Sequence, residues 1–524
     1  MHKKYAEKGV AFIGINANSH DSITEIAAYA RIHKIDFPML KDLGNRVADQ
    51  MQAVRTPEVF VLDEKRIVRY WGRIDDQYGV GYIRDKANRH DLRIALDELL
   101  DGKPVSQPVT KTEGCHIGRI LTPNPKSPVT FTKHIAPLLQ KHCVECHRKG
   151  DIAPFSLTKY SEVAGWAETI EEVVFDQRMP PWHADPKHGK FSNDRSLSKR
   201  EKQLIQTWVQ NGAPRGTGPE PVQKTQFISG WQLPQKPDVV FNMRKTPYTV
   251  PAEGEFTRTG QRRGVRYKYF VVDPGFKEDK WVKMAQAVPG NRAVVHHILV
   301  IVRPPFGKRR LGLGGGEFLV GYVPGLRANV LPPGVAKFVP AGSKLIFQMH
   351  YTPIGSEQTD LSKVGLVFAK PEEVKQVVFT TRAANHRFRI PAGANHHRVD
   401  ATSGTLPFDV QLLSMMPHMH LRGKSFKYVA KYPDGKTETL LNVPRYDFNW
   451  QTLYRLAKPK TFPAGTRMYC TAHFDNSAEN LSNPNPKRDV RWGDQTWDEM
   501  MIGYFDLLVP VEKFRAYLKS RRRF

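Results

Sequence analysis

The stretch "SMMPHMHLRGKSF", residues 414–426, places two histidines one residue apart, His418 and His420, among three methionines. Imidazole and thioether groups are side chains that soft transition metals prefer, and together they favour copper. On a β-strand alternate side chains face the same way, so both imidazoles can bind one ion while Met419 points to the opposite face. The stretch therefore predicts part of a metal site, and Met415 is expected to serve packing.

Three other places in the second half of the chain offer metal ligands. His296 and His297 lie in the apolar run "VVHHILV", His350 lies in "FQMHYTP", and Met500 lies in "WDEMMIGYF". A regular strand sends adjacent side chains to opposite faces, so His296 and His297 can bind one ion only where the strand is bulged or twisted. Taken alone, such histidines are more often structural than ligating. A second adjacent pair, in "NHHRV", follows a turn-like stretch and is expected at the surface.

The motif C-V-E-C-H supplies a different chemistry through Cys143, Cys146 and His147. This spacing is typical of covalent haem attachment, in which two thiols add to the haem vinyl groups and the adjacent histidine binds the iron. The alternative is half of a redox or zinc site, but a zinc site needs two further ligands. We therefore expect one covalently bound haem c.

The residues around this motif resemble a small class I cytochrome c. Amphipathic stretches at residues 131–143 and 196–214 correspond to the two helices that enclose the haem. The resemblance implies that Met179, in "QRMPPWH", is the sixth haem ligand, and methionine–histidine ligation suits electron transfer. His183, His188 or an open position are the alternatives. Haem attachment of this kind occurs outside the cytoplasm in bacteria, so we expect a periplasmic or secreted protein.

The first part of the chain alternates strand-like and helix-like patterns, which predicts an α/β sheet. The runs "GVAFIGINA" and "PEVFVLD" are typical of strands, and "SITEIAAYARIHK" is typical of a helix that Ser22 caps and Glu25 closes. Residues 1–110 resemble the redoxin branch of the thioredoxin fold, because Thr56–Pro57 matches its cis-proline turn. The redox cysteine of that family precedes the first strand found here.

Two explanations account for a redoxin-like segment without its redox cysteines. Either the start is truncated, so that a signal peptide, a strand and the active-site helix are missing, or the domain is degenerate and serves packing only. We favour truncation, because "MHKKYAEKG" is typical of a helix interior and lacks the apolar region of a signal peptide. Cys115, in "EGCHIGR", is expected to be an unreactive loop thiol.

Beyond a Pro/Gly-rich linker at residues 211–223, short alternating apolar runs predict β-sandwich or jelly-roll domains. We expect four domains in one chain. They are a partial α/β thioredoxin-like domain at 1–110, a small all-α cytochrome c domain at 126–216, and all-β jelly-rolls at 235–375 and 376–524. No apolar run reaches the length of about 18 residues that a transmembrane helix needs. The net charge of +27 is spread along the chain without a nucleic-acid-binding motif, which indicates a solvated surface.

The candidate ligands occur in an order that resembles the copper type II, ascorbate-dependent monooxygenases, the peptidylglycine α-hydroxylating and dopamine β-monooxygenase family. The resemblance spans residues 236–515 and implies two copper ions. It implies an electron-transfer copper held by His296, His297 and His350. It implies an oxygen-activating copper held by His418, His420 and Met500. The activity implied is hydroxylation of a C–H bond with O2, with one electron supplied by the electron-transfer copper.

The chain departs from that family at the expected substrate site. Met416 stands where peptidylglycine hydroxylases have an arginine that binds the substrate carboxylate, and Ile502 stands where they have an asparagine. Tyr504 retains the family's tyrosine and is a candidate catalytic residue. Cys470 is the only cysteine in this half, so the disulfides of the animal enzymes are excluded. The departures argue against glycine-extended peptides as substrates.

We therefore expect an exported oxidoreductase, a copper-dependent monooxygenase acting with O2 on a small molecule whose identity the sequence leaves open. An external donor, either an ascorbate-like reductant or a redox protein, would supply electrons, and the fused haem would pass them to the first copper. The alternative is a non-catalytic haem- and copper-containing electron-transfer or copper-binding protein. A thiol-dependent antioxidant centred on the first domain is a weaker third reading, because that domain has no cysteine pair.

Overall fold

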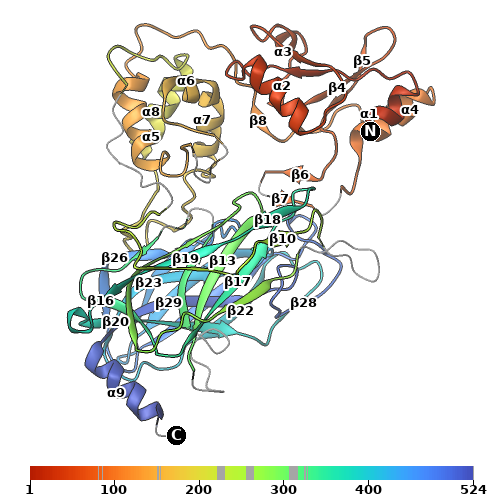
Figure 1. Cartoon of the computed structure of the whole chain (residues 1–524). Coiled ribbons are helices and arrows are strands. Elements are labelled where there is room, and N and C mark those ends of the chain that lie inside the picture. The colour runs from red at the N-terminus through yellow and green to blue at the C-terminus, as the bar shows by residue number, and fades with distance from the viewer. Residues whose placement is uncertain are drawn as a thin grey trace. The chain divides into compact units, whose positions relative to one another are not determined.

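The computed structural model describes residues 1–80, 82–84, 87–149, 153, 155–220, 231–254, 265–305, 317–323, 326 and 328–522. These residues form two compact units, drawn in Figure 1. The first unit comprises Met1–Pro181 and Arg195–Thr225, and the second comprises Trp182–Asp194 and Gln226–Phe524. No helix in the described part of the chain combines the length and the apolar character needed to cross a membrane.

The amino-terminal part of the first unit mixes short strands with helices. β1 (Gly14–Asn16) runs parallel to β2 (Met39–Lys41), and β4 (Val59–Leu62) pairs antiparallel with β5 (Val68–Gly72). The other elements here are α1 (His2–Ala6), α2 (Ile23–Ile32), α3 (Arg46–Gln50), β3 (Arg55–Thr56), β6 (Tyr78–Gly79), β7 (Tyr82–Ile83), α4 (Asp91–Leu100) and β8 (Cys115–His116). A small core joins α1, β5 and α4 through Tyr5, Tyr70, Leu92, Ala95 and Leu96.

Two local features of this part were predicted from the sequence. The hydroxyl of Ser22 accepts the backbone N–H of Glu25 at 3.2 Å, and the carboxylate of Glu25 accepts the N–H of Ser22 at 2.9 Å, so the expected capping box forms at α2. The Thr56–Pro57 peptide bond is cis. Beside it β3 pairs antiparallel with β8, which sets Cys115 opposite Thr56.

The remainder of the first unit is helical. Its elements are η1 (Phe131–Ile135), α5 (Ala136–His142), α6 (Tyr160–Val163), η2 (Ala164–Trp166), α7 (Ala167–Phe175) and α8 (Lys199–Gln210). Trp208 on α8 is fully buried and its indole N–H donates to the carbonyl of Pro214 at 3.1 Å. Ser198 caps α8 with Glu201, which accepts hydrogen bonds from Lys141 and His142 of the segment around α5. These contacts bring the two predicted amphipathic stretches together.

The second unit is built from β-strands, with helix α9 (Val511–Arg522) near its end. A long sheet has the strand order β26-β23-β29-β20-β16-β12-β19-β9, with β15 paired to β12. Its strands are β9 (Val239–Asn242), β12 (Lys280–Val288), β15 (Asn329–Val330), β16 (Val335–Val339), β19 (Lys363–Ala369), β20 (Gln376–Asn385), β23 (Val410–His418), β26 (Tyr454–Phe462) and β29 (Met501–Pro510). β16 and β20 pair in parallel, so one sheet runs through both halves of the unit.

Two four-stranded sheets complete the unit. The first has the order β11-β17-β13-β14 and consists of β11 (Lys268–Val272), β17 (Lys344–Tyr351), β13 (Val295–Arg303) and β14 (Glu317–Tyr322). The second has the order β22-β27-β24-β25 and consists of β22 (His397–Thr402), β27 (Arg467–Phe474), β24 (Gly423–Lys431) and β25 (Thr437–Val443). Short pairs and a turn remain: β10 (Tyr248–Val250), β18 (Gln358–Asp360), β21 (Arg389–Ile390), β28 (Val490–Arg491) and η3 (Pro371–Glu373).

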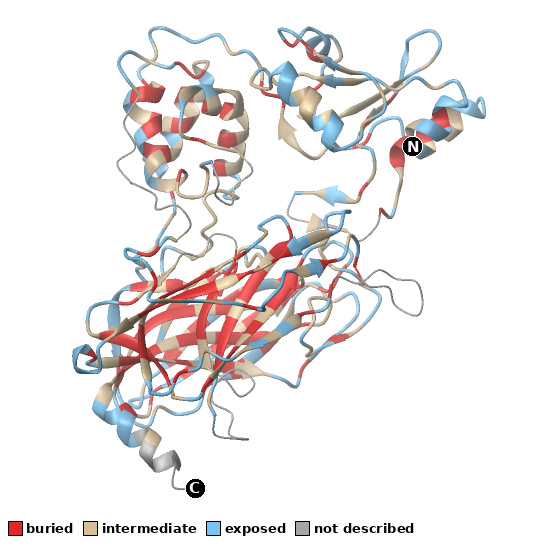
Figure 2. Ribbon diagram, viewed as in Figure 1, coloured by how far each residue is buried: buried red, intermediate tan, exposed pale blue. Residues whose placement is uncertain are grey.

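The core of the second unit lies between these sheets. One apolar cluster takes residues from β20, β23, β26 and β29 of the long sheet and from all four strands of the second small sheet, which is the arrangement of a β-sandwich. Figure 2 shows buried residues along the strands of this unit. Met415 and Met419 are both fully buried in the cluster, which agrees with the packing role predicted for Met415.

Candidate metal centre

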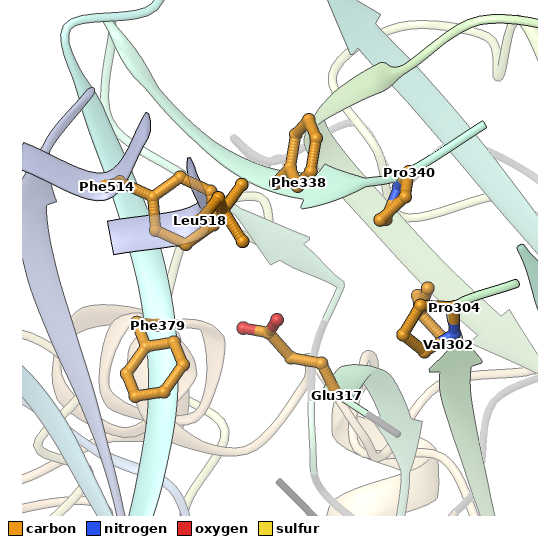
Figure 3. A pocket seen from close by; sticks show the side chains of 8 residues that line it. All are labelled: Val302, Pro304, Glu317, Phe338, Pro340, Phe379, Phe514 and Leu518. Carbon is orange, nitrogen blue, oxygen red and sulfur yellow. The ribbon is translucent and has the colours of Figure 1, made fainter. Parts of the chain in front are cut away.

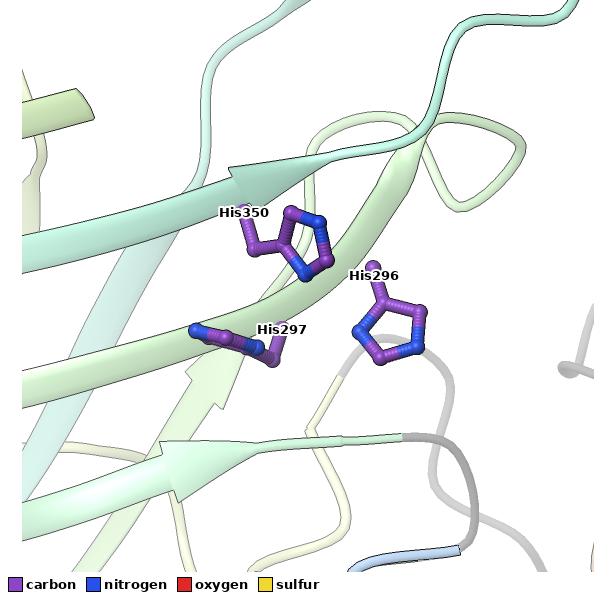
Figure 4. Close-up of side chains that lie close together, drawn as sticks. All are labelled: His296, His297 and His350. Atoms are coloured by element: carbon purple, nitrogen blue, oxygen red, sulfur yellow. The ribbon is translucent and has the colours of Figure 1, made fainter. Parts of the chain in front are cut away.

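Three histidines converge where β13 and β17 run side by side. The antiparallel ladder pairs His297 with His350 but shifts between Val295 and His297, so His296 is an extra, bulged residue. This bulge is the irregularity that the sequence required for adjacent histidines to share one ion. One ligand nitrogen from each of the three residues lies within 4.8 Å of the others, and Figure 4 shows their rings gathered beside the two strands. We call His296, His297 and His350 the histidine trio.

Two histidines of the trio are buried, and His296 is of intermediate exposure. His297 is 3% exposed and His350 is 7% exposed. Burial lowers the pKa of His296 to about 4 and holds the pKa values of His297 and His350 well below the ordinary value. The rings are therefore neutral at pH 7, and neutral imidazole is the metal-binding form. Ring nitrogens of all three have no hydrogen-bond partner, which is costly for buried polar atoms and fits the trio to a metal ion.

The H-x-H pair, His418 and His420, lies at the end of β23. The two ring centroids are 5.2 Å apart, so both side chains face one side as predicted. His418 Nδ1 lies 2.8 Å from Gln451 Oε1, and His420 Nδ1 lies 3.2 Å from the carbonyl oxygen of Asp498. Because both partners are acceptors, each Nδ1 carries the proton and each Nε2 keeps its lone pair.

Burial keeps the H-x-H pair neutral as well. It lowers the pKa of His418 to about 4 and the pKa of His420 to about 3. His420 is fully buried and its Nε2 has no hydrogen-bond partner. The donor set therefore fits a metal ion at this pair also, with each ring already held in the tautomer that presents Nε2.

Tyr504 lies on β29, and Met500 immediately precedes that strand. The antiparallel register sets His418 opposite Ile502. Tyr504 lies opposite Met416, and its ring centroid is 6.3 Å from that of His418. Burial raises the pKa of the Tyr504 hydroxyl, so it stays protonated. Of the residues proposed for this half-site, His418 lies on β23 and Tyr504 on β29, while His420 and Met500 lie just outside these strands.

A buried carboxylate that the sequence did not single out supports the H-x-H pair. Glu499 is fully buried and accepts the backbone N–H groups of His420 at 2.8 Å and of Arg422 at 2.7 Å. The guanidinium of Arg422 donates to Asn476 at 2.9 Å and to the carbonyl of Trp497 at 3.0 Å. Burial raises the pKa of Glu499 to about 7. These hydrogen bonds fix the backbone on which His420 stands.

Phe448 brings the two histidine groups together. Its ring stacks on His296 with centroids 5.2 Å apart, and it meets His420 edge to face at 6.0 Å. Burial is the largest cause that lowers the pKa of His297, followed by the neighbouring His296 and His418. The trio and the H-x-H pair, which the sequence assigned to two ligand sets, thus both lie against Phe448.

Tyr267 is a second aromatic residue at the trio that the sequence did not reveal. Its ring centroid lies 5.2 Å from that of His297 and 5.0 Å from that of His350. Its hydroxyl is buried without a hydrogen-bond partner, and burial raises its pKa. A protonated phenol is therefore available beside the trio as a hydrogen-bond donor.

The C-V-E-C-H motif lies in the first unit, directly after α5. The N–H groups of Cys146 and His147 donate to the carbonyl of Cys143 at 3.0 and 2.9 Å, which folds the motif into a tight turn. Burial raises the pKa of the Cys143 thiol to about 12. His147 Nδ1 lies 3.3 Å from the carbonyl oxygen of Phe155, which leaves the lone pair of Nε2 to bind a metal. The donor set fits a covalently attached haem.

The candidates for the sixth haem ligand fall in different units. Met179 lies in the first unit with the motif, and its N–H donates to the carbonyl of Val173 at 3.0 Å. His183 and His188 belong to the segment Trp182–Asp194 of the second unit.

The exposure of His396 and the pKa of Cys115 follow from the surroundings of each residue. His396 is exposed and stacks on His473 with centroids 4.2 Å apart, in agreement with the predicted surface position. Cys115 is half-buried, and burial raises the pKa of its thiol, which disfavours the reactive thiolate.

A small cavity lies elsewhere in the second unit. Figure 3 shows the carboxylate of Glu317 directed into a space of about 30 Å³ walled by apolar side chains. The lining residues are Val302, Pro304, Glu317, Phe338, Pro340, Phe379, Phe514 and Leu518. Burial raises the pKa of Glu317 to about 7. None of the candidate ligands lines this cavity.

Comparison with known proteins adds information on the front of the chain. Residues 1–71 match the AhpC/TSA family. A hypothetical protein from Sinorhizobium meliloti 1021 is 32% identical over 22% of this chain and 66% of its own, with a TM-score of 0.21. An uncharacterized conserved protein from Geobacillus kaustophilus is 30% identical over 22% of this chain and 62% of its own, with a TM-score of 0.20.

The chain thus spans less than two thirds of either solved structure, and TM-scores this low carry no argument about the fold. The AhpC/TSA match agrees with the redoxin resemblance of the amino-terminal segment and points to oxidoreductase chemistry.

Proposed function

We propose that the chain is an exported, copper-dependent monooxygenase that hydroxylates a C–H bond with O2 and draws electrons through a covalently attached haem c. The observation that carries the proposal is that Phe448 contacts both His296 of the trio and His420 of the H-x-H pair, with ring nitrogens of both groups lacking a hydrogen-bond partner. Copper bound there would supply one-electron redox chemistry and O2 binding.

The two histidine groups have different roles in this proposal, because their sets of ligands differ. The trio offers three nitrogens, which suits a site that only gains and loses electrons. The H-x-H pair offers two nitrogens, and Met500, which directly precedes β29, is the proposed third, softer ligand of a set that leaves room for O2. Gln451 and the carbonyl of Asp498 hold the tautomers of the pair, so no proton has to move before a metal binds.

The substrate is expected to be a small molecule without a carboxylate near the reacting carbon. Met416 and Tyr504 lie opposite each other on β23 and β29, on the strands that carry the H-x-H pair. A thioether cannot pair with a carboxylate, so this position contributes apolar contact instead. The protonated hydroxyl of Tyr504 can donate a hydrogen bond to a substrate oxygen.

The haem would be held by residues of the first unit. Cys143 and Cys146 would form the thioether links, His147 Nε2 would bind the iron, and Met179 is the preferred sixth ligand. In this proposal residues 126–216 form a cytochrome c domain, and residues 235–375 and 376–524 form two jelly-rolls. A periplasmic or secreted location follows from the need to attach haem covalently outside the cytoplasm. An ascorbate-like reductant or a redox protein would be the external donor.

Metal analysis and oxygen uptake test the proposal together. Full-length protein matured with haem and copper should contain two copper ions and one haem iron, and should consume O2 when reduced in the presence of a suitable small molecule. His420→Ala should lose one copper and the oxygen uptake, whereas His396→Ala, at an exposed histidine, should lose neither. One copper or none in the unaltered protein, with no oxygen uptake, would contradict it.

The second candidate is a non-catalytic haem and copper protein that stores or passes electrons. The observation that favours it is burial: His297, His350 and His420 are 3%, 7% and 0% exposed. An oxygen-activating metal needs an open coordination position, and these rings offer little access. Two bound coppers that are reduced and reoxidised without any product in the presence of candidate substrates would support this reading.

A further inference from the structure

The segment Trp182–Asp194, here called the strap, connects parts of the chain that carry the two kinds of candidate site. It begins three residues after Met179 and belongs to the second unit. There it lies along β26, which is the edge strand of the long sheet. Phe191 forms an antiparallel bridge with Leu456, and the N–H of Ser192 donates to the carbonyl of Arg455 at 2.9 Å. The strap thus occupies a sheet edge that would otherwise present unpaired backbone groups.

Aromatic packing reinforces this docking. Trp182, Phe191 and Tyr454 form a mutual set of edge contacts, with ring centroids 5.0 to 5.7 Å apart. Trp182 and Phe191 pack against the main apolar core of the unit, and Tyr454 is 2% exposed within it. The strap is therefore an integral part of the sandwich.

The strap is bonded to both ends of one loop, residues 444–453 between β25 and β26. On the β25 side, the N–H of Asp185 donates to the carbonyl of Asn442 at 2.8 Å. On the β26 side, the amide of Asn193 donates to the carbonyl of Leu453 at 2.6 Å and accepts the N–H of Arg455 at 3.0 Å. Both points at which the loop leaves the sheet are thus held by the same thirteen-residue segment.

That loop carries three residues of the metal centre. Gln451 accepts the Nδ1 proton of His418, and Phe448 lies between His296 and His420. The hydroxyl of Tyr446 both accepts the N–H of Met419 and donates to its carbonyl, at 3.1 and 2.8 Å. A displacement of the loop would therefore alter the support of the H-x-H pair directly, whereas the trio would lose only the contact with Phe448.

We propose that the strap is a positioning element for the H-x-H pair, in which Trp182 acts through Tyr454 and the 444–453 loop to hold Gln451 against His418. Trp182 touches no ligand itself. The inference rests on the proposed function only in that it takes His418 and His420 to be metal ligands. It adds that the affinity of this pair for metal depends on the strap, which follows Met179 of the first unit in the sequence.

Two measurements on the full-length chain test the proposal. The first is hydrogen–deuterium exchange of the metal-free protein, in which Trp182→Ala should speed exchange in the 444–453 loop while the β24 peptide keeps its protection. The second is titration of the metal-free protein with copper. Trp182→Ala should weaken copper binding at the H-x-H pair about 10-fold or more, which is the range expected when the support of a ligand is lost. Copper affinity at the trio should stay within about two-fold of that of the unaltered protein.

Phe408→Ala is the matched control, because Phe408 is also partly buried against the same core but precedes β23 at the end opposite His418. The Trp182→Ala/Gln451→Leu double variant should bind copper at the H-x-H pair no more weakly than Gln451→Leu alone, because both substitutions act on the contact between Gln451 and His418. Additive losses, an equal loss in Phe408→Ala, or unchanged loop exchange in Trp182→Ala would overturn the inference. If unaltered protein binds no second copper, the proposed function fails, while the exchange experiment still decides whether the strap holds the loop.

Discussion

Phe448 stacks on His296 with ring planes 13° from parallel, although the two residues are separated by about 150 positions in the chain. The contact joins ligands that the sequence assigns to different halves of the β unit. We predict that Phe448→Leu, which keeps an apolar side chain but removes the stacked ring, weakens copper binding at both histidine groups and lowers the free energy of unfolding by about 1 to 2 kcal/mol.

Copper titration and chemical denaturation measure the two effects. Phe388→Leu is the appropriate control, because Phe388 is similarly buried, at 9% against 8%, and is stacked on Phe474 in the same unit. It should lose similar stability and keep both copper affinities. Equal copper affinities in the Phe448 variant and the unaltered protein would show that Phe448 serves packing only.

The bulge at His296 leads to a prediction about the two adjacent histidine pairs. His297→Ala should remove one equivalent of bound copper, because the trio would be reduced to two nitrogens. His397→Ala changes the second residue of the other pair, which starts β22 and has no part in the cluster. It should leave the copper content unchanged, as measured by elemental analysis after exhaustive dialysis. Retention of two coppers by His297→Ala would contradict the assignment of the trio.

The raised pKa of Glu317 makes the stability of the folded state fall as pH rises. Its folded-state pKa of about 7 lies above the ordinary value of 4.5, chiefly through burial and despite the nearby Lys337. Between these values the unfolded chain releases the proton and the folded chain keeps it, so stability falls as pH rises. Glu317→Gln should therefore gain on the order of 2 kcal/mol relative to the unaltered protein between pH 5 and pH 7.5.

Urea denaturation at the two pH values measures this difference. Glu372→Gln, an exposed carboxylate on η3, should show no comparable change between them. A Glu317→Gln variant whose stability follows that of the unaltered protein at both pH values would mean that the carboxylate is ionised in the cavity.

Removal of the two thiols separates the haem from the copper chemistry. The Cys143→Ala/Cys146→Ala variant should bind no covalent haem, shown by the loss of haem staining on denaturing gels. Its copper content should stay the same, because the thiols and the histidine cluster lie in different units. Oxygen uptake should fall with a protein electron donor but persist with ascorbate. Unchanged turnover with the protein donor would refute a role for the haem in electron supply.

The sequence was informative where local chemistry controls geometry. The rings of His418 and His420 lie 5.2 Å apart, in agreement with two side chains that face the same way, and capping chemistry was enough to place the start of α2. It left the orientation of His296 open, because a bulge depends on the pairing of two strands about 50 residues apart and leaves no local signal.

The residues that support the centre could not be predicted for the same reason. Glu499, Gln451 and Phe448 come from loops whose side chains reach the histidines only after the sheets have paired. A glutamine or a phenylalanine in a loop has no spacing rule that would mark it. The strap was equally hidden, since its sequence lies inside the stretch that resembles a cytochrome c, while its contacts are those of a β-strand edge.

The parallel pairing of β16 with β20 bears on how such a protein can be altered by recombination. Because one sheet runs through both halves of the β unit, the hydrogen bonds at that seam belong to neither half alone. A cut between the halves would expose a new sheet edge on each and would separate the trio from the H-x-H pair. The β unit is therefore one module, to be exchanged or transplanted whole.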